Sequence, residues 1–252
     1  MIHLKAVGLL VFLAIVLAIM PSHVSAGMSF PHDGAKLTYQ IIEMDNSSFG
    51  SISAVTNDTY FFSKLGDSWN VTETLTGKIA CSPSTGTLTI KYGTTSDIMG
   101  QNATALKSSN ISIQVSYIVK DRMVLSTPIG PNVPASYEAT CNFGGINQVF
   151  TSGGTPAVDA SAFKYYVLTY IQPAGVSPGS SVPVSIMTAT ITGTQNVQVL
   201  GKSRTAFVGT ISGLLSGIMY WDSSSGILLL AKSTIGDMTE QVQLVQSSDL
   251  AP

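Results

Sequence analysis

Apolar and polar residues alternate along most of the chain after residue 27. The run 110–119 (NISIQVSYIV) is apolar at every second position, and similar runs occur at 35–44, 164–171, 182–191 and 239–245. A period of two is typical of strands with one buried face and one solvated face. Clusters of Gly, Pro and Asn separate these runs and indicate turns. The pattern therefore predicts an all-β fold, a β-sandwich of the pilin-like or immunoglobulin-like kind.

The N-terminus carries the features of an export signal. Lys5 gives a short basic stretch, residues 6–20 (AVGLLVFLAIVLAIM) are uniformly apolar, and residues 24–26 (VSA) match a small-residue cleavage site. The apolar run is shorter than the roughly 20 residues that a transmembrane helix needs. A cleaved signal peptide is therefore predicted, with a mature chain that begins at Gly27. An uncleaved anchor and type IV pilin-like processing after Lys5 are the two alternatives.

The sequence predicts three regions. Residues 1–26 are the signal peptide, residues 27–51 are an N-terminal extension, and residues 52–252 are the β-sandwich domain. The segment 171–183 (IQPAGVSPGSSVP) is a candidate subdivision, because its prolines and glycines disfavour regular strand pairing. This segment either separates two β-subdomains or forms a long loop within one sandwich.

Charge and hydropathy exclude several partners. Charged residues make up 10% of the chain, the net charge is −2, and the basic residues are scattered. Nucleic-acid binding requires clustered Lys and Arg, so no nucleic-acid partner is expected. The C-terminus has no second apolar stretch, so no membrane attachment is expected after the signal peptide is removed. The predicted location is outside the cell, either secreted or at the cell surface.

Histidine is too scarce for the commonest catalytic and metal sites. Only His32 remains after the predicted signal peptide. A Ser-His-Asp triad needs a well-positioned imidazole, and catalytic zinc sites draw on one to three histidines. We therefore expect no catalytic residues, no metal site and no cofactor, and the chain is not predicted to be an enzyme.

Carboxylates leave one alternative open. Glycosidases use two Asp or Glu side chains, and an aromatic ring beside a carboxylate can bind a sugar. Asp222, which follows Trp221, is the most suggestive acid. The competing interpretation is a tight turn, in which the Asp side chain bonds to its own backbone. Four glutamates also follow the signal peptide: Glu43, Glu73, Glu138 and Glu240.

Two cysteines, Cys81 and Cys141, are predicted to form a disulfide. An exported chain with an even number of cysteines favours a bridge. Metal binding is the poorer interpretation, because two thiols without nearby histidines do not complete a four-ligand site.

The strongest positive signal is a set of glycosylation sequons. Five N-x-S/T sequences lack proline at the middle position, and all lie in the first half of the mature chain. We expect N-linked glycans on solvent-exposed side chains, which would keep a charge-poor chain soluble. The predicted sites are Asn46, Asn57, Asn70, Asn102 and Asn110.

Taken together, these features resemble those of archaeal extracellular filament subunits. The features are the signal peptide, the Ser/Thr-rich β-domain, the clustered sequons and the absence of a catalytic set. The hairpin sequence 220–229 (YWDSSSGILL) also resembles one that is common in archaeal exported β-proteins. The architecture is most similar to that of archaeal thread pilins, which join head to tail by donor-strand complementation. The resemblance implies a structural subunit of a glycosylated filament, with a role in adhesion and with other copies of the chain as partners.

The resemblance also implies a donor strand near the mature N-terminus. Leu37, Tyr39 and Ile41 alternate with polar residues and precede a polar stretch at 45–51 that could serve as a tether. An added strand of this kind would complete the sheet of a neighbouring subunit. An ordinary first strand has the same alternation, so both interpretations remain open.

Two other functions are compatible with the sequence. A type IV pilin-like or archaellin-like filament subunit differs from the leading interpretation in how its N-terminus is processed. A secreted carbohydrate-binding module or glycosidase would need exposed aromatic side chains beside carboxylates.

Overall fold

The computed structural model describes residues 32–83, 87–93, 102–105, 108–120, 122–125, 136–150, 170–172, 175–184, 187–213 and 215–250. These residues form fifteen strands and no helix, which confirms the all-β prediction. The strands are β1 (Lys36–Asn46), β2 (Ser51–Leu65), β3 (Ser68–Ser82), β4 (Thr87–Gly93), β5 (Asn102–Ala105), β6 (Ser108–Lys120), β7 (Met123–Val124), β8 (Ser136–Phe143), β9 (Ile146–Phe150), β10 (Ser181–Val184), β11 (Met187–Val199), β12 (Lys202–Ile211), β13 (Ser216–Asp222), β14 (Leu228–Ile235) and β15 (Met238–Ser247).

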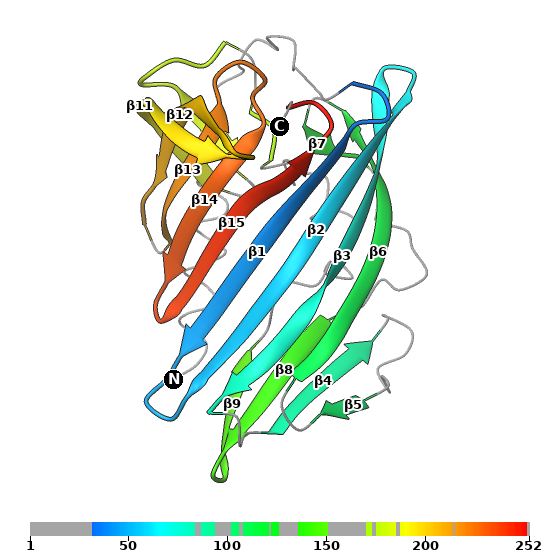
Figure 1. The fold of residues 1–252 in the computed structure, drawn as a ribbon, viewed down its shortest axis with the longest axis vertical. Helices are drawn as coiled ribbons and strands as arrows, with labels where there is room; N and C mark the ends of the chain where they lie inside the picture. The colour runs from blue at the N-terminus through cyan, green and yellow to red at the C-terminus, as the bar shows by residue number, and fades with distance from the viewer. Residues whose placement is uncertain are drawn as a thin grey trace, which may run out of the picture.

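The strands form two antiparallel sheets of unequal size (Figure 1). The large sheet has eleven strands in the order β10-β11-β12-β13-β14-β15-β1-β2-β3-β6-β7, and the small sheet has four in the order β5-β4-β8-β9. The small sheet lies at one end of the large sheet, near the end of β3. The disulfide joins the two sheets, because Cys81 lies in β3 and Cys141 in β8 with their Cα atoms 5.9 Å apart. This confirms the predicted cysteine pair.

The alternation of burial along β2 explains how the large sheet acquires its inner face. The even-numbered residues from 52 to 62 are buried, while the odd-numbered residues between them are exposed or half-buried. The buried side chains join the main hydrophobic core with residues from β1, β3 and the C-terminal strands. The sheet therefore has one apolar face and one polar face, as a period of two predicts.

The first strand, β1, lies in the middle of the large sheet and not at its edge. It pairs with β15 on one side and with β2 on the other, and both partners belong to the same chain. Leu37 and Tyr39 are fully buried in the chain's own core, and Ile41 is half-buried against it. The assignment of these residues to a donor strand is therefore wrong, because neither edge of β1 is available to a neighbour. The alternative, an ordinary first strand, is what the structure shows.

The predicted strand at 182–191 is divided between two strands. β10 and β11 form a hairpin in which Val184 pairs with Met187. Pro183 has no N–H to donate, and β10 is an edge strand, the position where a proline is tolerated. The large sheet contains strands from both sides of the segment 171–183. Strands β1, β2, β3, β6 and β7 precede this segment in the chain, strands β11 to β15 follow it, and the two groups are joined where β15 pairs with β1. The predicted start of the β-sandwich domain, residue 52, lies within β2, and β2 is the neighbour of β1 in the large sheet.

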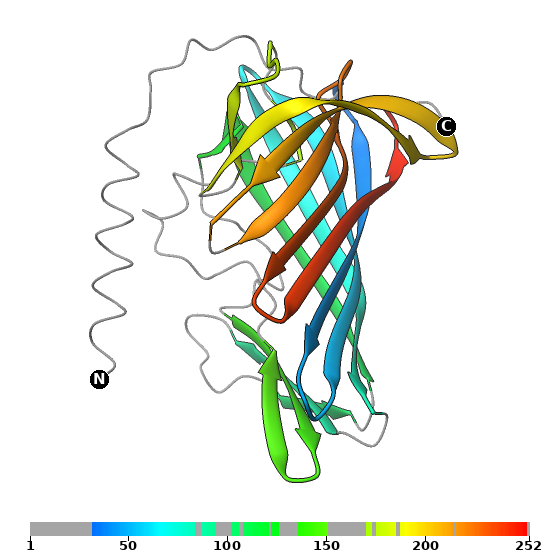
Figure 2. The ribbon, with the colours of Figure 1, turned by 90° about the vertical axis from the view of Figure 1, so that its left-hand side faces the viewer.

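The large sheet curls so far that its two edges meet (Figure 2). Arg122, beside the edge strand β7, donates a hydrogen bond of 3.0 Å to the carbonyl oxygen of Pro183 in the opposite edge strand β10. The Arg122 side chain is buried, and burial lowers its pKa to about 10. The curl turns the apolar face inward, so that face can enclose a binding site.

Residues 1–31 lie outside the part of the chain that the structure describes. The predicted signal peptide, the cleavage site before Gly27 and the pilin-like alternative all fall there. Among the described residues, no helix has the length and apolar character that spanning a membrane requires.

Candidate functional site

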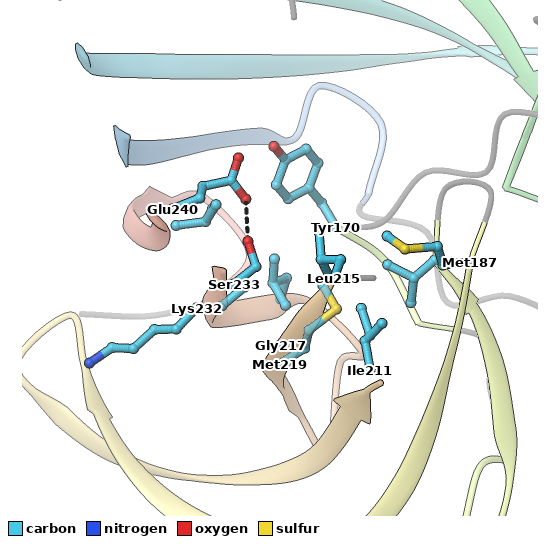
Figure 3. Close-up of a pocket in the computed structure, with 13 residues that line it drawn as sticks. Tyr170, Met187, Ile211, Leu215, Gly217, Met219, Lys232, Ser233 and Glu240 are labelled. Carbon is cyan, nitrogen blue, oxygen red and sulfur yellow. Dashed lines mark hydrogen bonds between the residues drawn. The ribbon is translucent and has the colours of Figure 1, made fainter. Parts of the chain in front are cut away.

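A pocket of about 260 Å³ opens on the inner face of the C-terminal half of the large sheet (Figure 3). Each of the strands β10 to β15 contributes to it, and Tyr170 closes one side. Most of the wall is aliphatic or thioether side chain. The lining residues with such side chains are Val184, Met187, Ile211, Leu215, Met219, Leu228, Ala231 and Val242.

The pocket exists because small residues face one another on the inner side of adjacent strands. Gly217 in β13 pairs with Ser233 in β14, and Met219 pairs with Ala231. Three of these four positions carry a side chain no larger than that of serine, so the space above them is not filled by the sheet itself. Longer side chains such as Ile211 then border the space and do not occupy it.

One end of the pocket is polar. The hydroxyl of Ser233 donates a hydrogen bond of 3.4 Å to Oε1 of Glu240, and Figure 3 shows the two side chains pointing toward each other. Glu43 of β1 lies directly opposite Glu240 in the β1–β15 pair. Burial, followed by the charge of Glu43, raises the pKa of Glu240, whereas the Ser233 hydrogen bond opposes the shift.

Tyr170 connects the pocket to a second group of inner residues. Its ring stacks on that of Tyr39 with centroids 4.4 Å apart, and it lies 4.9 Å from the ring of Tyr60. The rings of Tyr39 and Tyr60 meet edge to face at 6.2 Å. The three rings therefore form a rigid aromatic wall beside the pocket, since aromatic pairs of this kind stabilise each other beyond their buried area.

Two inward-facing carboxylates, the buried Asp58 and the half-buried Glu73, bond to tyrosine hydroxyl groups in this region. The hydroxyl of Tyr60 donates a hydrogen bond to Oδ2 of Asp58, and that of Tyr117 donates one of 2.8 Å to Oε2 of Glu73. We call these four residues, together with Tyr39 and Tyr170, the acid–tyrosine cluster. Glu73 pairs with Tyr60 across β2 and β3, so the two carboxylates occupy neighbouring positions on the inner face.

Burial dominates the electrostatics of the cluster. It raises the pKa of Asp58 well above the usual range, with a further rise from the charge of Glu73, and it raises the pKa of Glu73. The pKa of Tyr39 is raised by burial and then by Asp58. Oδ1 of Asp58 and the hydroxyl of Tyr39 have no hydrogen-bond partner within the described part of the chain. A buried polar atom without a partner is costly, and protonation of the carboxyl reduces that cost.

The residues proposed for sugar binding do not form an exposed site. The side chain of Trp221 is fully buried, and Asp222 is 4% exposed. Oδ1 of Asp222 accepts hydrogen bonds from the backbone N–H groups of Ser224 and Ser225. Asp222 is thus the corner of the β13–β14 turn, which is the competing interpretation stated for this sequence.

The structure places three of the five predicted glycosylation sites. Asn46 at the end of β1 and Asn57 in β2 are exposed, and Asn70 in β3 is half-buried. Asn102 begins β5, and Asn110 lies in β6. The side chains of these last two residues lie outside the described part of the structure. The five sites therefore lie in five different strands: β1, β2, β3, β5 and β6.

Within the described ranges, no three His, Cys, Asp or Glu side chains are grouped so that they could hold a metal ion. His32 is exposed, and its Nδ1 contacts Oδ1 of Asp249, near the other end of the described chain. This pair brings the two ends of the described chain together and lies outside the pocket.

The sequence did not single out the inner carboxylates Asp58, Glu73 and Glu240 as a site, although it contains a signal for them. Asp58 lies in phase with the apolar positions of β2, Glu73 in phase with Val71 and Leu75, and Glu240 in phase with Val242. In a chain with only 10% charged residues, a carboxylate at an apolar position of an alternating strand is unusual.

Comparisons with known proteins leave the family open. No protein-family model and no curated protein matches the chain. Among solved structures, a β-barrel-like protein of domain of unknown function DUF1849 from Brucella abortus is 12% identical, and the match covers 86% of this chain and 98% of that one. The TM-score of 0.29 is too low for this likeness to support any statement about the present chain.

Proposed function

We propose that the chain is an exported binding protein whose pocket holds the apolar part of a small molecule. The pocket itself carries the proposal: about 260 Å³ bounded by methionine and aliphatic side chains, with a carboxyl and a hydroxyl group at one end. Ligand sites are typically concave and mostly apolar, with a few polar groups that fix orientation. The volume lies near the lower limit of roughly 300 Å³ for such sites, so the ligand is small, such as a short alkyl chain or one ring.

Binding fits the lining residues better than catalysis does. Ser233 lies beside Glu240, but the residues that line the pocket include no histidine to act as a general base near neutral pH. The aliphatic wall supplies burial of apolar surface, which contributes about 25 cal/mol per Å². The hydroxyl of Ser233 and the carboxyl of Glu240, at the polar end, fix the orientation of the ligand.

Export is part of the same proposal. The bond between Cys81 and Cys141 is of the kind that persists in oxidising compartments. Asn46 and Asn57 are exposed, so glycans attached there would extend into solvent without disturbing the core. Both observations support the location that the N-terminal signal predicts.

Calorimetric titration of the mature chain with octanol tests the proposed pocket. Octanol should bind, and Ala231→Leu should abolish binding because the added side chain fills the space that Ala231 leaves open. Val245→Leu, on the exposed side of β15, is the matched control and should bind octanol as the unaltered chain does. Circular dichroism of each variant checks that the fold is retained. The proposal fails if octanol does not bind, or if a folded Ala231→Leu variant binds it equally well.

A second candidate is a glycosylated filament subunit, as the resemblance to archaeal thread pilins implies. The observation that favours it is the outer edge of β6. In the part of the chain that the structure describes, β7 covers β6 only at its last residues, and residues 108–117 have no strand on that side. An exposed edge of this length can accept a strand from another chain. In a filament of this kind, β6 would accept a strand from a neighbouring copy of the chain, and β1 would not be the strand that is donated.

Electron microscopy of material sheared from the producing cells tests the second candidate. Filaments whose peptides map to this chain would support it. Filaments that contain no copy of this chain, or a secreted chain that remains monomeric at high concentration, would rule it out. Neither outcome bears on octanol binding, so the two candidates are tested independently.

A further inference from the structure

The ring of Tyr170 forms the boundary between the pocket and two of the inner tyrosines. Tyr170 lines the pocket, and Figure 3 shows its ring beside the aliphatic lining side chains. The same ring stacks on that of Tyr39, with centroids 4.4 Å apart and planes 26° apart, and its centroid lies 4.9 Å from that of Tyr60. Tyr39 and Tyr60 are buried and are not among the residues that line the pocket. One side chain therefore separates the pocket from these two rings.

Backbone contacts fix the Tyr170 ring in place. The N–H of Leu228 donates a hydrogen bond of 2.8 Å to the carbonyl oxygen of Tyr170, and the N–H of Gln172 donates one of 2.8 Å to the carbonyl oxygen of Gly226. Ile171, which lies between these two contacts, is fully buried. Gly226 has a φ of +77°, and a Cβ atom there would lie 3.1 Å from the carbonyl oxygen of Gln172, so glycine permits this close approach. The short segment is thus held at both ends, and the ring is a fixed wall of the pocket.

This arrangement gives Tyr170 a role in selecting ligands by size. We infer that the Tyr170 side chain sets the size of the largest apolar ligand that the pocket accepts. A ligand that fills the pocket meets this ring, and the ring cannot retreat because Tyr39, on which it stacks, is fully buried. Loss of a packed side chain leaves a cavity, and here the cavity would extend the pocket toward the rings of Tyr39 and Tyr60. This inference rests on the proposed function and adds the residue that limits the ligand.

A series of straight-chain alcohols from pentanol to dodecanol, titrated into the mature chain, tests the inference. Each CH₂ group that the pocket buries should strengthen binding about fourfold until the pocket is full. In the unaltered chain this gain should therefore stop at one member of the series. In Tyr170→Ala the gain should continue for roughly two to four further carbons, because the ligand can enter the space that the ring occupied. If no alcohol binds the unaltered chain, the proposed function itself fails. If alcohols bind and the gain stops at the same alcohol in both chains, the inference is wrong while the binding function stands.

Three further variants separate the size limit from a general effect on the fold. Tyr170→Phe keeps the ring and should keep the limit of the unaltered chain. Tyr170→Leu is a smaller change that takes the place of Tyr170→Ala if circular dichroism shows that the alanine variant does not fold, and it should also move the limit to a longer alcohol. Tyr220→Leu is the matched control, because Tyr220 is half-buried in β13 and is not one of the residues that line the pocket. Weaker binding of every alcohol by the Tyr170 variants at an unchanged limit, or a moved limit in Tyr220→Leu, overturns the assignment of Tyr170.

Discussion

The indole ring of Trp221 occupies the space directly above the backbone of Gly209. A Cβ atom at Gly209 would lie 2.5 Å from Cζ3 of Trp221 and 3.4 Å from Cβ of Ala189. Trp221 is fully buried, so its ring cannot move into solvent to make room. The absence of a side chain at Gly209 is therefore what allows Trp221, the largest of the fully buried side chains, to pack against β12 at this position.

This relationship predicts that Gly209→Ala is destabilising. The added methyl group would force a shift of the ring or of β12, and overpacking of this kind costs about 1–3 kcal/mol. Gly193→Ala is the matched control, because Gly193 lies in the neighbouring strand β11 and a Cβ there would meet no atom within 4 Å. Denaturant unfolding followed by tryptophan fluorescence measures both. Equal stability of the two variants would contradict the account.

The acid–tyrosine cluster predicts a chain that is more stable in acid than in mild base. The pKa of Asp58 is raised in the folded chain, mainly by burial. Its contribution to stability is therefore fully present below the unfolded value of about 4 and is lost as the pH rises through the folded pKa. Asp58→Asn removes the charge and keeps the size, so stability should fall less steeply as the pH rises above about 4, and the variant should be the more stable of the two once the pH exceeds the folded pKa of Asp58.

Asp67→Asn provides the control for this pH series. The pKa of Asp67 is lowered by its hydrogen bond to Lys120, so its contribution is present above the unfolded pKa and is lost as the pH falls. Because Asp67 is exposed, its removal should leave the decline of stability toward high pH unchanged. A decline that persists in full in Asp58→Asn would show that Asp58 is not its source.

The disulfide predicts a stability difference between the oxidised and reduced chains. It joins residues 60 positions apart and links the large sheet to the small one. Closing a loop of this length restricts the unfolded chain and contributes about 4 kcal/mol in the chain-entropy model. Reductant should lower the denaturation midpoint of the unaltered chain. It should have no effect on the variant in which Cys81 and Cys141 are both alanine, which should resemble the reduced chain.

The solvent exposure of the predicted glycosylation sites indicates which of them should carry glycans most often. Asn46 and Asn57 are exposed, while Asn70 lies half-buried in β3 between β2 and β6. Glycopeptide mass spectrometry of the protein from its producing cells should find the first two sites occupied at least as fully as the third. Replacing Asn57 by Gln should change the stability of the unglycosylated chain by less than about 0.5 kcal/mol. A secreted chain with both exposed sites unmodified would contradict the glycosylation hypothesis.

The strands could be predicted because the alternation of apolar and polar residues that indicates a strand lies within one short stretch of sequence. The alternations at 35–44, 110–119 and 239–245 correspond to β1, β6 and β15, and each is visible within a single short stretch of sequence. The disulfide between Cys81 and Cys141 could be predicted because the chain has an export signal and an even number of cysteines. The division between β10 and β11 was missed, because apolar residues lie close to it on both sides in the sequence.

The pocket and the position of β1 could not be predicted because they depend on pairing between distant residues. The backbone N–H of Lys36 donates to the hydroxyl of Ser248, 212 residues away. Glu43 and Glu240 are neighbours for the same reason, and nothing near either residue in the sequence indicates the other. Donor-strand assignment failed here as well, since an alternating strand has the same sequence whether its partners are its own or a neighbour's.

The pairing of β1 with β15 sets an order of events for a chain that is made from its N-terminus. When β1, β2 and β3 have formed their hairpins, β1 still lacks its second partner, because β15 is the last of the described strands along the chain. The large sheet therefore cannot be completed before β15 has been made, and a late, long-range closure of this kind slows folding. Until then Leu37 and Tyr39 have only one of their two neighbouring strands. The pocket is completed at the same late step, because β15 supplies two of its lining residues, Glu240 and Val242.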